Sequence, residues 1–171
     1  MSADARKPSR AWRVSGAISA AVLAIAMREG FRDTAYQPIK GDEVTIGYGT
    51  TRYPDGAPVR PGDTVTPERA RKLLEADADA TAKGIERCIG GVPLSQGEWS
   101  AYLSFAYNVG APAFCRSTLA KKLHQNPPDY AGACAELLRW NRAQGRVVQG
   151  LTNRRFDEYR QCMGLQNAYV E

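Results

Sequence analysis

The chain has 171 residues, of which 43% are hydrophobic and 24% charged, with a net charge of +5 and a pI near 9.1. This length holds one domain or two small lobes, and the composition is neither that of a disordered chain nor that of a membrane-spanning one. The positive charge favours a polyanionic partner such as nucleic acid or an anionic cell wall. No basic run is interleaved with stacking aromatic residues, so we do not expect nucleic-acid binding.

The N-terminal region carries several basic residues and continues as an uncharged, alanine-rich run from Val14 to Met27. This pattern is similar to a secretory signal. The run has only 14 residues, however, and is too short for a stable membrane span. Cleavage within it would leave Glu29 almost at the new N-terminus. We therefore expect a structural helix over residues 15–28 behind a flexible tail of residues 1–14, with signal-anchor-type export as the alternative.

A β-rich segment and a long helix are expected next. Glycines punctuate β-prone residues between Tyr36 and Tyr53, which predicts a small antiparallel hairpin or meander. A Pro- and Gly-rich crossing follows. Thr66-Pro67-Glu68 then predicts a helix start with Thr66 as N-cap, and apolar residues at helical spacing continue this helix to Cys88. One long helix after a small β-rich lobe suggests a connection between two lobes.

The rest of the chain is expected to be helical. Ser95 and Glu98 have the spacing of a capping box and open an apolar helix that ends at Gly110. Shorter helices are expected at residues 117–124, 128–140 and 153–163. The predicted fold class is α+β: a small lobe with a β-hairpin at about 15–65, a connecting helix at about 66–88, and an all-α lobe at about 89–171.

The four cysteines are too far apart for a CxxC metal or redox motif: Cys88, Cys115, Cys134 and Cys162. Together with a single histidine, His124, this spacing argues against a zinc site or a Ser-His hydrolase. The even number allows two disulfides in an oxidising compartment, with three pairings to choose from. Otherwise the four thiols would pack as small buried hydrophobes. We expect no metal and no cofactor.

Glu29, Asp42 and Thr45 have the chemistry of a glycosidase site. Such a site needs one carboxyl group that stays protonated to donate to the leaving oxygen, and a second, ionised one that positions water or stabilises developing positive charge. Glu29 ends an apolar helix, where desolvation would raise its pKa. Asp42 follows a glycine in a turn and would stay charged, and the Thr45 hydroxyl could hold water. An isolated Glu-Gly pair is more often a solvated helix end. The assignment of Glu29 as a catalytic residue therefore depends on the motifs downstream.

Three segments resemble the bacteriophage lysozyme (endolysin) family of peptidoglycan muramidases: Arg28-Glu29-Gly30-Phe31, Thr45-Ile46-Gly47-Tyr48-Gly49 and Phe105-Ala106-Tyr107-Asn108-Val109-Gly110. The resemblance covers about residues 15–163. It implies a lysozyme-like fold with the cleft between two lobes. It also implies hydrolysis of the β-1,4 bond between N-acetylmuramic acid and N-acetylglucosamine, which causes host lysis. The implied enzyme is a monomer without stable membrane insertion, made in the host cytoplasm and acting on the wall in the periplasm.

The second carboxylate departs from the family's pattern. The family has an acid or cysteine nine residues after the catalytic Glu and a Thr six residues later. Here Pro38 occupies the first of these positions, and Thr45 lies one residue further on than usual. Asp42 is the nearest acid in the loop and is our choice, with Glu43 and Asp33 as alternatives.

The resemblance also assigns residues in the second lobe. Tyr107 and Ser117 would contact the sugar, with core packing as the alternative for Tyr107. Gly150-Leu151-Thr152-Asn153-Arg154-Arg155 is similar to the family's C-terminal helix, where an Asn-Arg pair places a guanidinium against the catalytic Glu. By position that residue is Arg154, which would orient Glu29. A surface charge is the alternative.

Two rival functions remain open. A lytic transglycosylase uses a similar fold and one Glu without a second carboxylate, and Pro38 keeps this reading open. It leaves a 1,6-anhydro sugar, whereas a muramidase leaves a reducing end. The second rival is a catalytically inactive wall-binding module.

Overall fold

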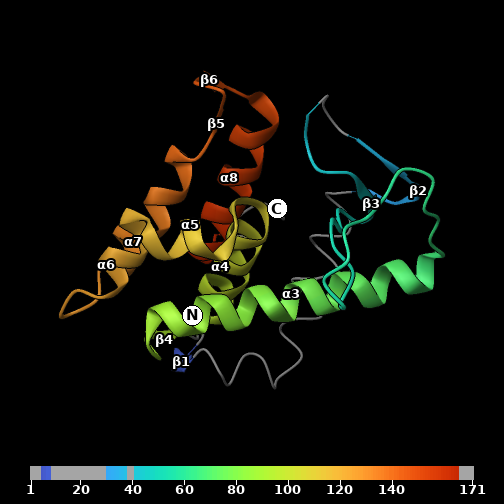
Figure 1. Ribbon diagram of the computed structural model, residues 1–171. Helices are drawn as coiled ribbons and strands as arrows, with labels where there is room; N and C mark the ends of the chain where they lie inside the picture. The colour runs from blue at the N-terminus through green and yellow to red at the C-terminus, as the bar shows by residue number, and fades with distance from the viewer. Residues whose placement is uncertain (1–4, 9–29, 38–40, 166–171) are drawn as a thin grey trace, which may run out of the picture. The chain divides into compact units, whose positions relative to one another are not determined.

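The computed structural model describes residues 5–8, 30–37 and 41–165 (Figure 1). The chain divides into two compact units, one of residues Ser19–Ala80 and one of Met1–Ile18 together with Thr81–Glu171. The helix expected at 15–28, and with it Glu29 and Pro38, lies outside the described residues.

The Ser19–Ala80 unit contains a β-hairpin. Strand β2 (Arg32–Tyr36) pairs antiparallel with β3 (Thr45–Gly47), with Arg32 opposite Gly47 and Tyr36 opposite Thr45. The predicted hairpin is thus confirmed, and its first strand begins four residues earlier than expected. Under the hairpin lies a small apolar core: Ile46, Val59, Val65, Ala70 and Leu73.

Gly47 fits this hairpin against the helix that follows. Its φ is +65°, in the left-handed region that side chains disfavour. A Cβ built on Gly47 would lie 2.9 Å from the Cβ of Ala70, closer than carbon atoms pack. Glycine at this position therefore satisfies two requirements, the backbone turn and the close approach.

Helix α3 (Pro67–Ile89) is the predicted long helix. It begins as expected: the Thr66 hydroxyl accepts a hydrogen bond from the Arg69 N–H at 3.3 Å, and Pro67 occupies the first helical position. It ends at Ile89, one residue beyond the predicted end at Cys88.

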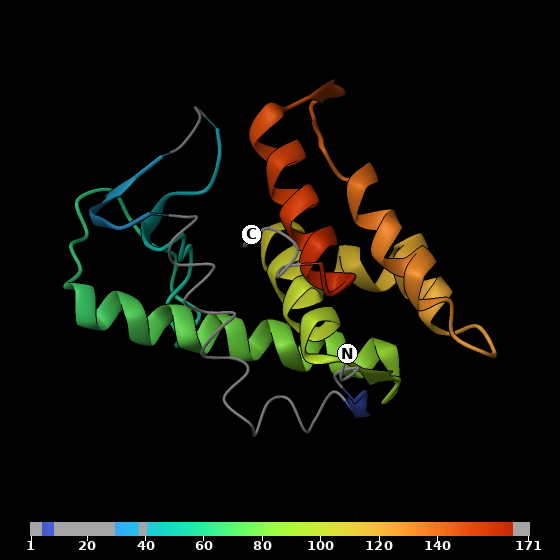
Figure 2. The same ribbon diagram turned by 180° about the vertical axis from the view of Figure 1, so that it is seen from behind.

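Helix α4 (Gln96–Val109) is the centre of the other unit, which we call the helical unit. The predicted capping box is present, since Glu98 N–H donates to Ser95 Oγ at 3.1 Å and Ser95 N–H donates to the Glu98 carboxylate at 2.7 Å. Every residue from Glu98 to Ala106 is buried. Helix α8 (Gln149–Cys162) packs along α4, and both views show the two helices side by side (Figures 1 and 2).

Shorter elements follow α4 along the chain. They are α5 (Ala111–Arg116), α6 (Thr118–Leu123), α7 (Tyr130–Glu136) and the 3-10 turn η1 (Leu137–Arg139). The sequence pattern did not predict α5. It merged α7 and η1 into one helix, and it began α8 four residues too late.

A second hairpin was also not predicted. Strands β5 (Arg142–Ala143) and β6 (Arg146–Val147) pair antiparallel through a two-residue turn, Gln144-Gly145. Both turn residues have positive φ, 48° and 77°. These are the dihedrals of the tight turn that matches the twist of a hairpin.

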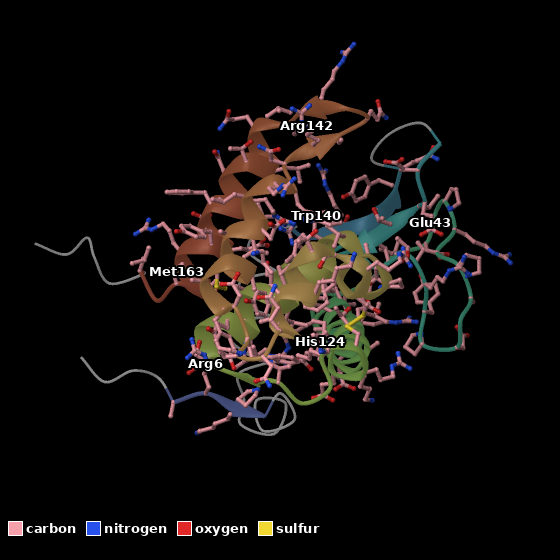
Figure 3. All side chains as sticks on the ribbon, turned by 90° about the vertical axis from the view of Figure 1, so that its left-hand side faces the viewer. Arg6, Glu43, His124, Trp140, Arg142 and Met163 are labelled. Atoms are coloured by element: carbon pink, nitrogen blue, oxygen red, sulfur yellow. A yellow bond between two sulfur atoms is a disulfide. The ribbon has the colours of Figure 1, made fainter. Side chains whose placement is uncertain are left out.

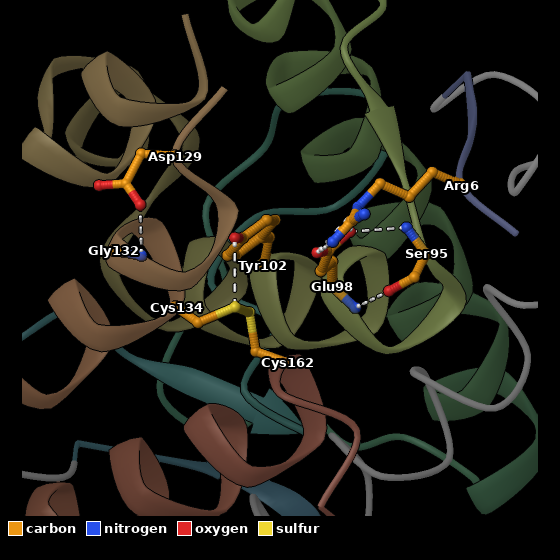
Figure 4. The surroundings of a disulfide bond; sticks show 8 residues. All are labelled: Arg6, Ser95, Glu98, Tyr102, Asp129, Gly132, Cys134 and Cys162. Atoms are coloured by element: carbon orange, nitrogen blue, oxygen red, sulfur yellow. Dashed lines mark hydrogen bonds and ion pairs between the residues drawn. A yellow bond between two sulfur atoms is a disulfide. The ribbon is translucent and has the colours of Figure 1, made fainter. Parts of the chain in front are cut away.

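Residues 5–8 are bound to the helical unit, although we expected them in a flexible tail. Strand β1 (Lys7–Pro8) pairs with β4 (Pro93–Leu94). The Arg6 guanidinium forms a 2.8 Å ion pair with Glu98, whose side chain is only 4% exposed, and lies 3.8 Å from the centre of the Tyr130 ring. Figure 4 shows Arg6 and Ser95 on the same carboxylate.

The structure contains two disulfides, which form one of the three pairings that the sequence allowed. Cys88 is bonded to Cys115, and Cys134 is bonded to Cys162. The first joins α3 to α5 and the second joins α7 to α8. Tyr102 of α4 lies against the second bond, with its hydroxyl 3.6 Å from Cys134 Sγ (Figure 4). Burial of the Tyr102 phenol raises its pKa.

Candidate functional site

The Thr45–Thr50 turn is held rigidly in the Ser19–Ala80 unit. Ile46 and Thr50 exchange backbone hydrogen bonds of 2.9 and 3.0 Å across the glycines. The Thr50 hydroxyl, which is buried, donates to Asp77 Oδ2 on α3 at 2.9 Å. Burial raises the pKa of the Asp77 carboxyl, and the Thr50 hydrogen bond partly opposes this shift. The turn is therefore fixed to the helix at its far end as well as at Gly47.

Asp42 and Thr45 lie on the same hairpin. Asp42 is exposed in the loop that leads into β3, and its carbonyl oxygen accepts a 2.7 Å hydrogen bond from Gln37 Nε2 across the loop. Thr45 is half-buried at the start of β3, with its hydroxyl donating to the Tyr36 carbonyl at 3.4 Å. Asp42 and Thr45 thus lie three residues apart at the loop end of the hairpin.

The two alternative acids are placed differently. Glu43, labelled in Figure 3, forms an exposed ion pair with Arg52 at 3.6 Å. Asp33 lies near the opposite end of β2 from the loop, where its side chain accepts from the Thr34 hydroxyl at 3.1 Å. It lines a separate cavity of about 320 Å³ with Arg69. Asp42 lies in the loop three residues before Thr45, whereas Glu43 is ion-paired with Arg52 and Asp33 lies at the far end of β2.

The helical unit contains a buried cluster of charges on α4 and α8. Glu158 and Arg155 are both fully buried and form an ion pair of 2.9 Å between Arg155 Nε and Glu158 Oε2. Glu158 Oε1 also accepts a 2.7 Å hydrogen bond from the Ser104 hydroxyl and lies 3.3 Å from Arg154 Nε. One carboxylate thus contacts two guanidinium groups.

This cluster reaches the segment that resembled the sugar cleft. Arg155 Nη2 donates to the side-chain oxygen of Asn108 at 3.2 Å, and the Arg155 guanidinium lies 4.9 Å from the centre of the Phe105 ring. Arg154 is 12% exposed and donates to the Ser104 carbonyl at 3.4 Å, so it is not the surface charge of the alternative reading. Tyr107 is half-buried beside Asn108.

Ser117 lies at the rim of a cavity of about 370 Å³. Its hydroxyl is buried, donates to the Phe114 carbonyl at 2.6 Å and accepts from the Ala120 N–H at 3.1 Å. The first bond is made to the last turn of α5, and the second caps the start of α6. The residues around the cavity include two cations, one acid and an indole: Ala113, Arg116, Ser117, Thr118, Glu136, Arg139 and Trp140. Trp140, labelled in Figure 3, packs edge-on against Phe105 at 5.1 Å between ring centres.

Sequence reasoning missed the members of the charge cluster other than Arg154. A signal was present: Arg154, Arg155 and Glu158 have the three- and four-residue spacings at which helical side chains meet. The partners Ser104 and Asn108 come from α4, about 50 residues earlier, and no local pattern predicts that pairing.

Among residues 5–8, 30–37 and 41–165, no group of three or more His, Cys, Asp or Glu side chains is arranged to hold a metal ion. Within the same ranges, no helix combines the length and the apolar character that a membrane crossing requires.

Comparison with known proteins places these features in one family. The phage lysozyme family model matches residues 26–158. The chain is 38% identical over 131 residues to an endolysin of Bacillus phage PZA, covering 76% of this chain and 48% of that protein. The chain thus spans about half the length of the Bacillus phage relatives that it matches. It is 34% identical over 169 residues to a SAR-endolysin of bacteriophage PS119, covering 93% of this chain and 97% of that one.

A solved structure agrees with this placement. The endolysin from Escherichia coli O157:H7 phage FAHEc1 superimposes with a TM-score of 0.73 at 34% identity, over 88% of this chain and 94% of that chain. The α+β, lysozyme-like fold expected from the sequence is therefore confirmed. The family match spans most of the chain and includes the hairpin, the long helix and the buried charge cluster. The chain belongs to the phage lysozyme family.

Proposed function

We propose that this protein is a muramidase, an endolysin that hydrolyses the β-1,4 bond between N-acetylmuramic acid and N-acetylglucosamine in bacterial peptidoglycan. The observation that carries the proposal is the phage lysozyme match over residues 26–158. This range includes all the candidate site residues: Glu29, Asp42, Thr45, Tyr107, Ser117 and Arg154.

In this proposal two carboxyl groups divide the chemistry. Glu29 is the general acid that protonates the leaving glycosidic oxygen. The Asp42 carboxylate, with the Thr45 hydroxyl, positions the attacking water. The exposure of Asp42 supports its part, because water can reach its carboxylate. A carboxylate that positions water predicts an inverting reaction, for which the two carboxyl groups stand ~6.5–9.5 Å apart.

Arg154 is a positioning residue in the same proposal. Its guanidinium would hold the orientation of the Glu29 carboxyl and limit the rise of its pKa. The ion pair with Glu158 supports this role, because it restricts the Arg154 side chain to one arrangement. Tyr107 and the rim of the cavity at Ser117 would contact the sugar chain, with the cavity wide enough to take part of it.

The test is the clearing of outer-membrane-permeabilised Gram-negative cells, with the masses of the released muropeptides recorded. We expect lysis and reducing-end products from the wild type, and loss of lysis in both Glu29→Gln and Asp42→Asn. Activity that survives in Asp42→Asn would remove Asp42 from the mechanism and return the choice to Glu43 or Asp33.

The same experiment separates the rival functions. A lytic transglycosylase would release 1,6-anhydro products, and the match to the lysozyme family does not favour it. An inactive wall-binding module would bind cells without clearing them. We further propose that the protein acts as a monomer on the wall in the periplasm. The similarity to a SAR-endolysin supports export to that compartment.

A further inference from the structure

The β5–β6 region has an unusual distribution of charge. Residues 137–156 contain no acidic side chain and five arginines: Arg139, Arg142, Arg146, Arg154 and Arg155. The last two belong to the buried cluster with Glu158. The other three are exposed: Arg139 forms a 3.5 Å ion pair with Glu136, and Arg142 and Arg146 lie on the β5–β6 hairpin. A positive potential therefore gathers at this projection.

The hairpin also exposes aliphatic side chains. Val147 is 55% exposed and Val148 is 38% exposed. The register places Arg142 opposite Val147, so these two side chains share one face. Val148 N–H donates to the Asn141 carbonyl, which continues the pairing and puts Val148 on the other face with Arg146. Each face of the hairpin thus carries one arginine and one valine.

The tip between the strands is small and uncharged. It consists of Ala143, Gln144 and Gly145, all exposed. The Arg142 guanidinium donates to the Gly145 carbonyl at 3.0 Å, which satisfies one polar group of the turn and holds the side chain near the tip. The two-residue turn makes this projection rigid and narrow.

We propose that the β5–β6 hairpin is a contact site for an anionic phospholipid surface, entered tip first. The arginines would remain at the depth of the lipid phosphates, where each positive side chain gains attraction from the negative surface. Val147 and Val148 would reach the boundary with the acyl chains, which favours burial of apolar groups. A polyanionic sugar polymer would account for the arginines alone, whereas a lipid surface also accounts for a valine beside each of them. This contact is peripheral and is independent of the muramidase site.

Vesicle co-sedimentation of the full chain tests the proposal. We expect binding to vesicles of phosphatidylglycerol and phosphatidylethanolamine, and little binding to phosphatidylcholine alone. The double variant Arg142→Gln/Arg146→Gln should lose binding at least ~10-fold, because each arginine held near an anionic membrane raises the affinity by several-fold and the variant removes two of them. Val147→Ser/Val148→Ser, which leaves the charge unchanged, should weaken binding several-fold.

The matched control removes two positive charges elsewhere. Arg87→Gln/Lys121→Gln changes exposed residues of α3 and α6 and should retain nearly all vesicle binding. Equal losses in the two charge variants, or no effect of the valine variant, would show that the overall positive charge of the protein, and not the hairpin, binds the vesicles. Either result would overturn the proposal. Binding to lipid-free peptidoglycan should be the same for wild type and hairpin variants. A loss there with vesicle binding intact would assign the hairpin to the wall and also overturn the proposal. Circular dichroism confirms that each variant is folded.

Discussion

The hydroxyl of Thr50 and the carboxylate of Asp77 form a 2.9 Å hydrogen bond between the Thr45–Thr50 turn and helix α3. Thr50 is buried, and burial raises the pKa of Asp77. The bond therefore connects the segment that carries Thr45 to a carboxyl group whose ionisation is disfavoured by burial.

This relationship predicts a pH-dependent stability. Since the Asp77 pKa is raised in the folded state above its ordinary value of 3.8, its stabilising contribution is fully present below that pH and is lost as pH rises through the folded pKa. Asp77→Asn, which can still accept from Thr50, should abolish this loss. Urea unfolding at pH 3 to 7 should show the variant gaining stability relative to wild type as pH rises. Asp55→Asn, an exposed change, should show no such gain; a parallel pH dependence of wild type and Asp77→Asn would contradict the prediction.

Gly47 should tolerate no side chain. Gly47→Ala combines a positive φ with a contact of 2.9 Å to Ala70, and we expect a loss of about 2–4 kcal/mol in the free energy of unfolding. Gly56→Ala is the matched control, because Gly56 has a φ of +86° but open space around the new Cβ. It should lose only about 1 kcal/mol. Similar losses for the two variants would mean that contact with α3 contributes little.

Removal of Glu158 should destabilise the helical unit. Glu158→Ala would leave Arg154 and the fully buried Arg155 without this carboxylate, at a cost of about 3–5 kcal/mol. The measurement is chemical unfolding, with Asp157→Ala as the control at the adjacent, exposed position. The control should change stability by less than about 1 kcal/mol. If both changes are equally mild, the cluster does not stabilise the packing of α4 on α8.

The two disulfides should be reduced in a defined order. Cys134 and Cys162 are buried, at 1% and 5% exposure, whereas Cys88 and Cys115 are half-buried. Thiolate attack requires access to sulfur, so the Cys88–Cys115 bond should open first as dithiothreitol is raised. Alkylation followed by mass spectrometry identifies the residues. Each bond closes a sequence separation of 27 or 28 residues, and its loss should cost about 3–4 kcal/mol. Earlier labelling of Cys134 would contradict the order.

Local signals in the sequence predicted the starts and ends of α3 and α4. Thr66-Pro67 and the Ser95–Glu98 capping box act within one helical turn, so their geometry follows from residue types alone. The same holds for the glycines that shape the β2–β3 hairpin. Family resemblance then supplied the fold and the candidate residues of the site.

Features that depend on distant pairing could not be predicted in this way. Four cysteines allow three pairings, and the packing of α5 and α8 selects one. The β5–β6 hairpin has strands of two residues, and Gln144 at positive φ gives no turn signal of the usual glycine or asparagine type. The buried Arg155 looks like a surface residue in the sequence, because its partners on α4 are remote along the chain.

The attachment of Arg6 to Glu98 has a consequence for synthesis on the ribosome. The two residues are 92 positions apart, so Arg6 is made long before its partner. At ~5–20 residues per second, the delay is about 5–20 s. Throughout that interval strand β1 has no β4 to pair with and the Tyr130 ring does not yet exist. Residues 6–8 are thus translated well before the elements that they contact, and they can form their native contacts only after those elements have been made.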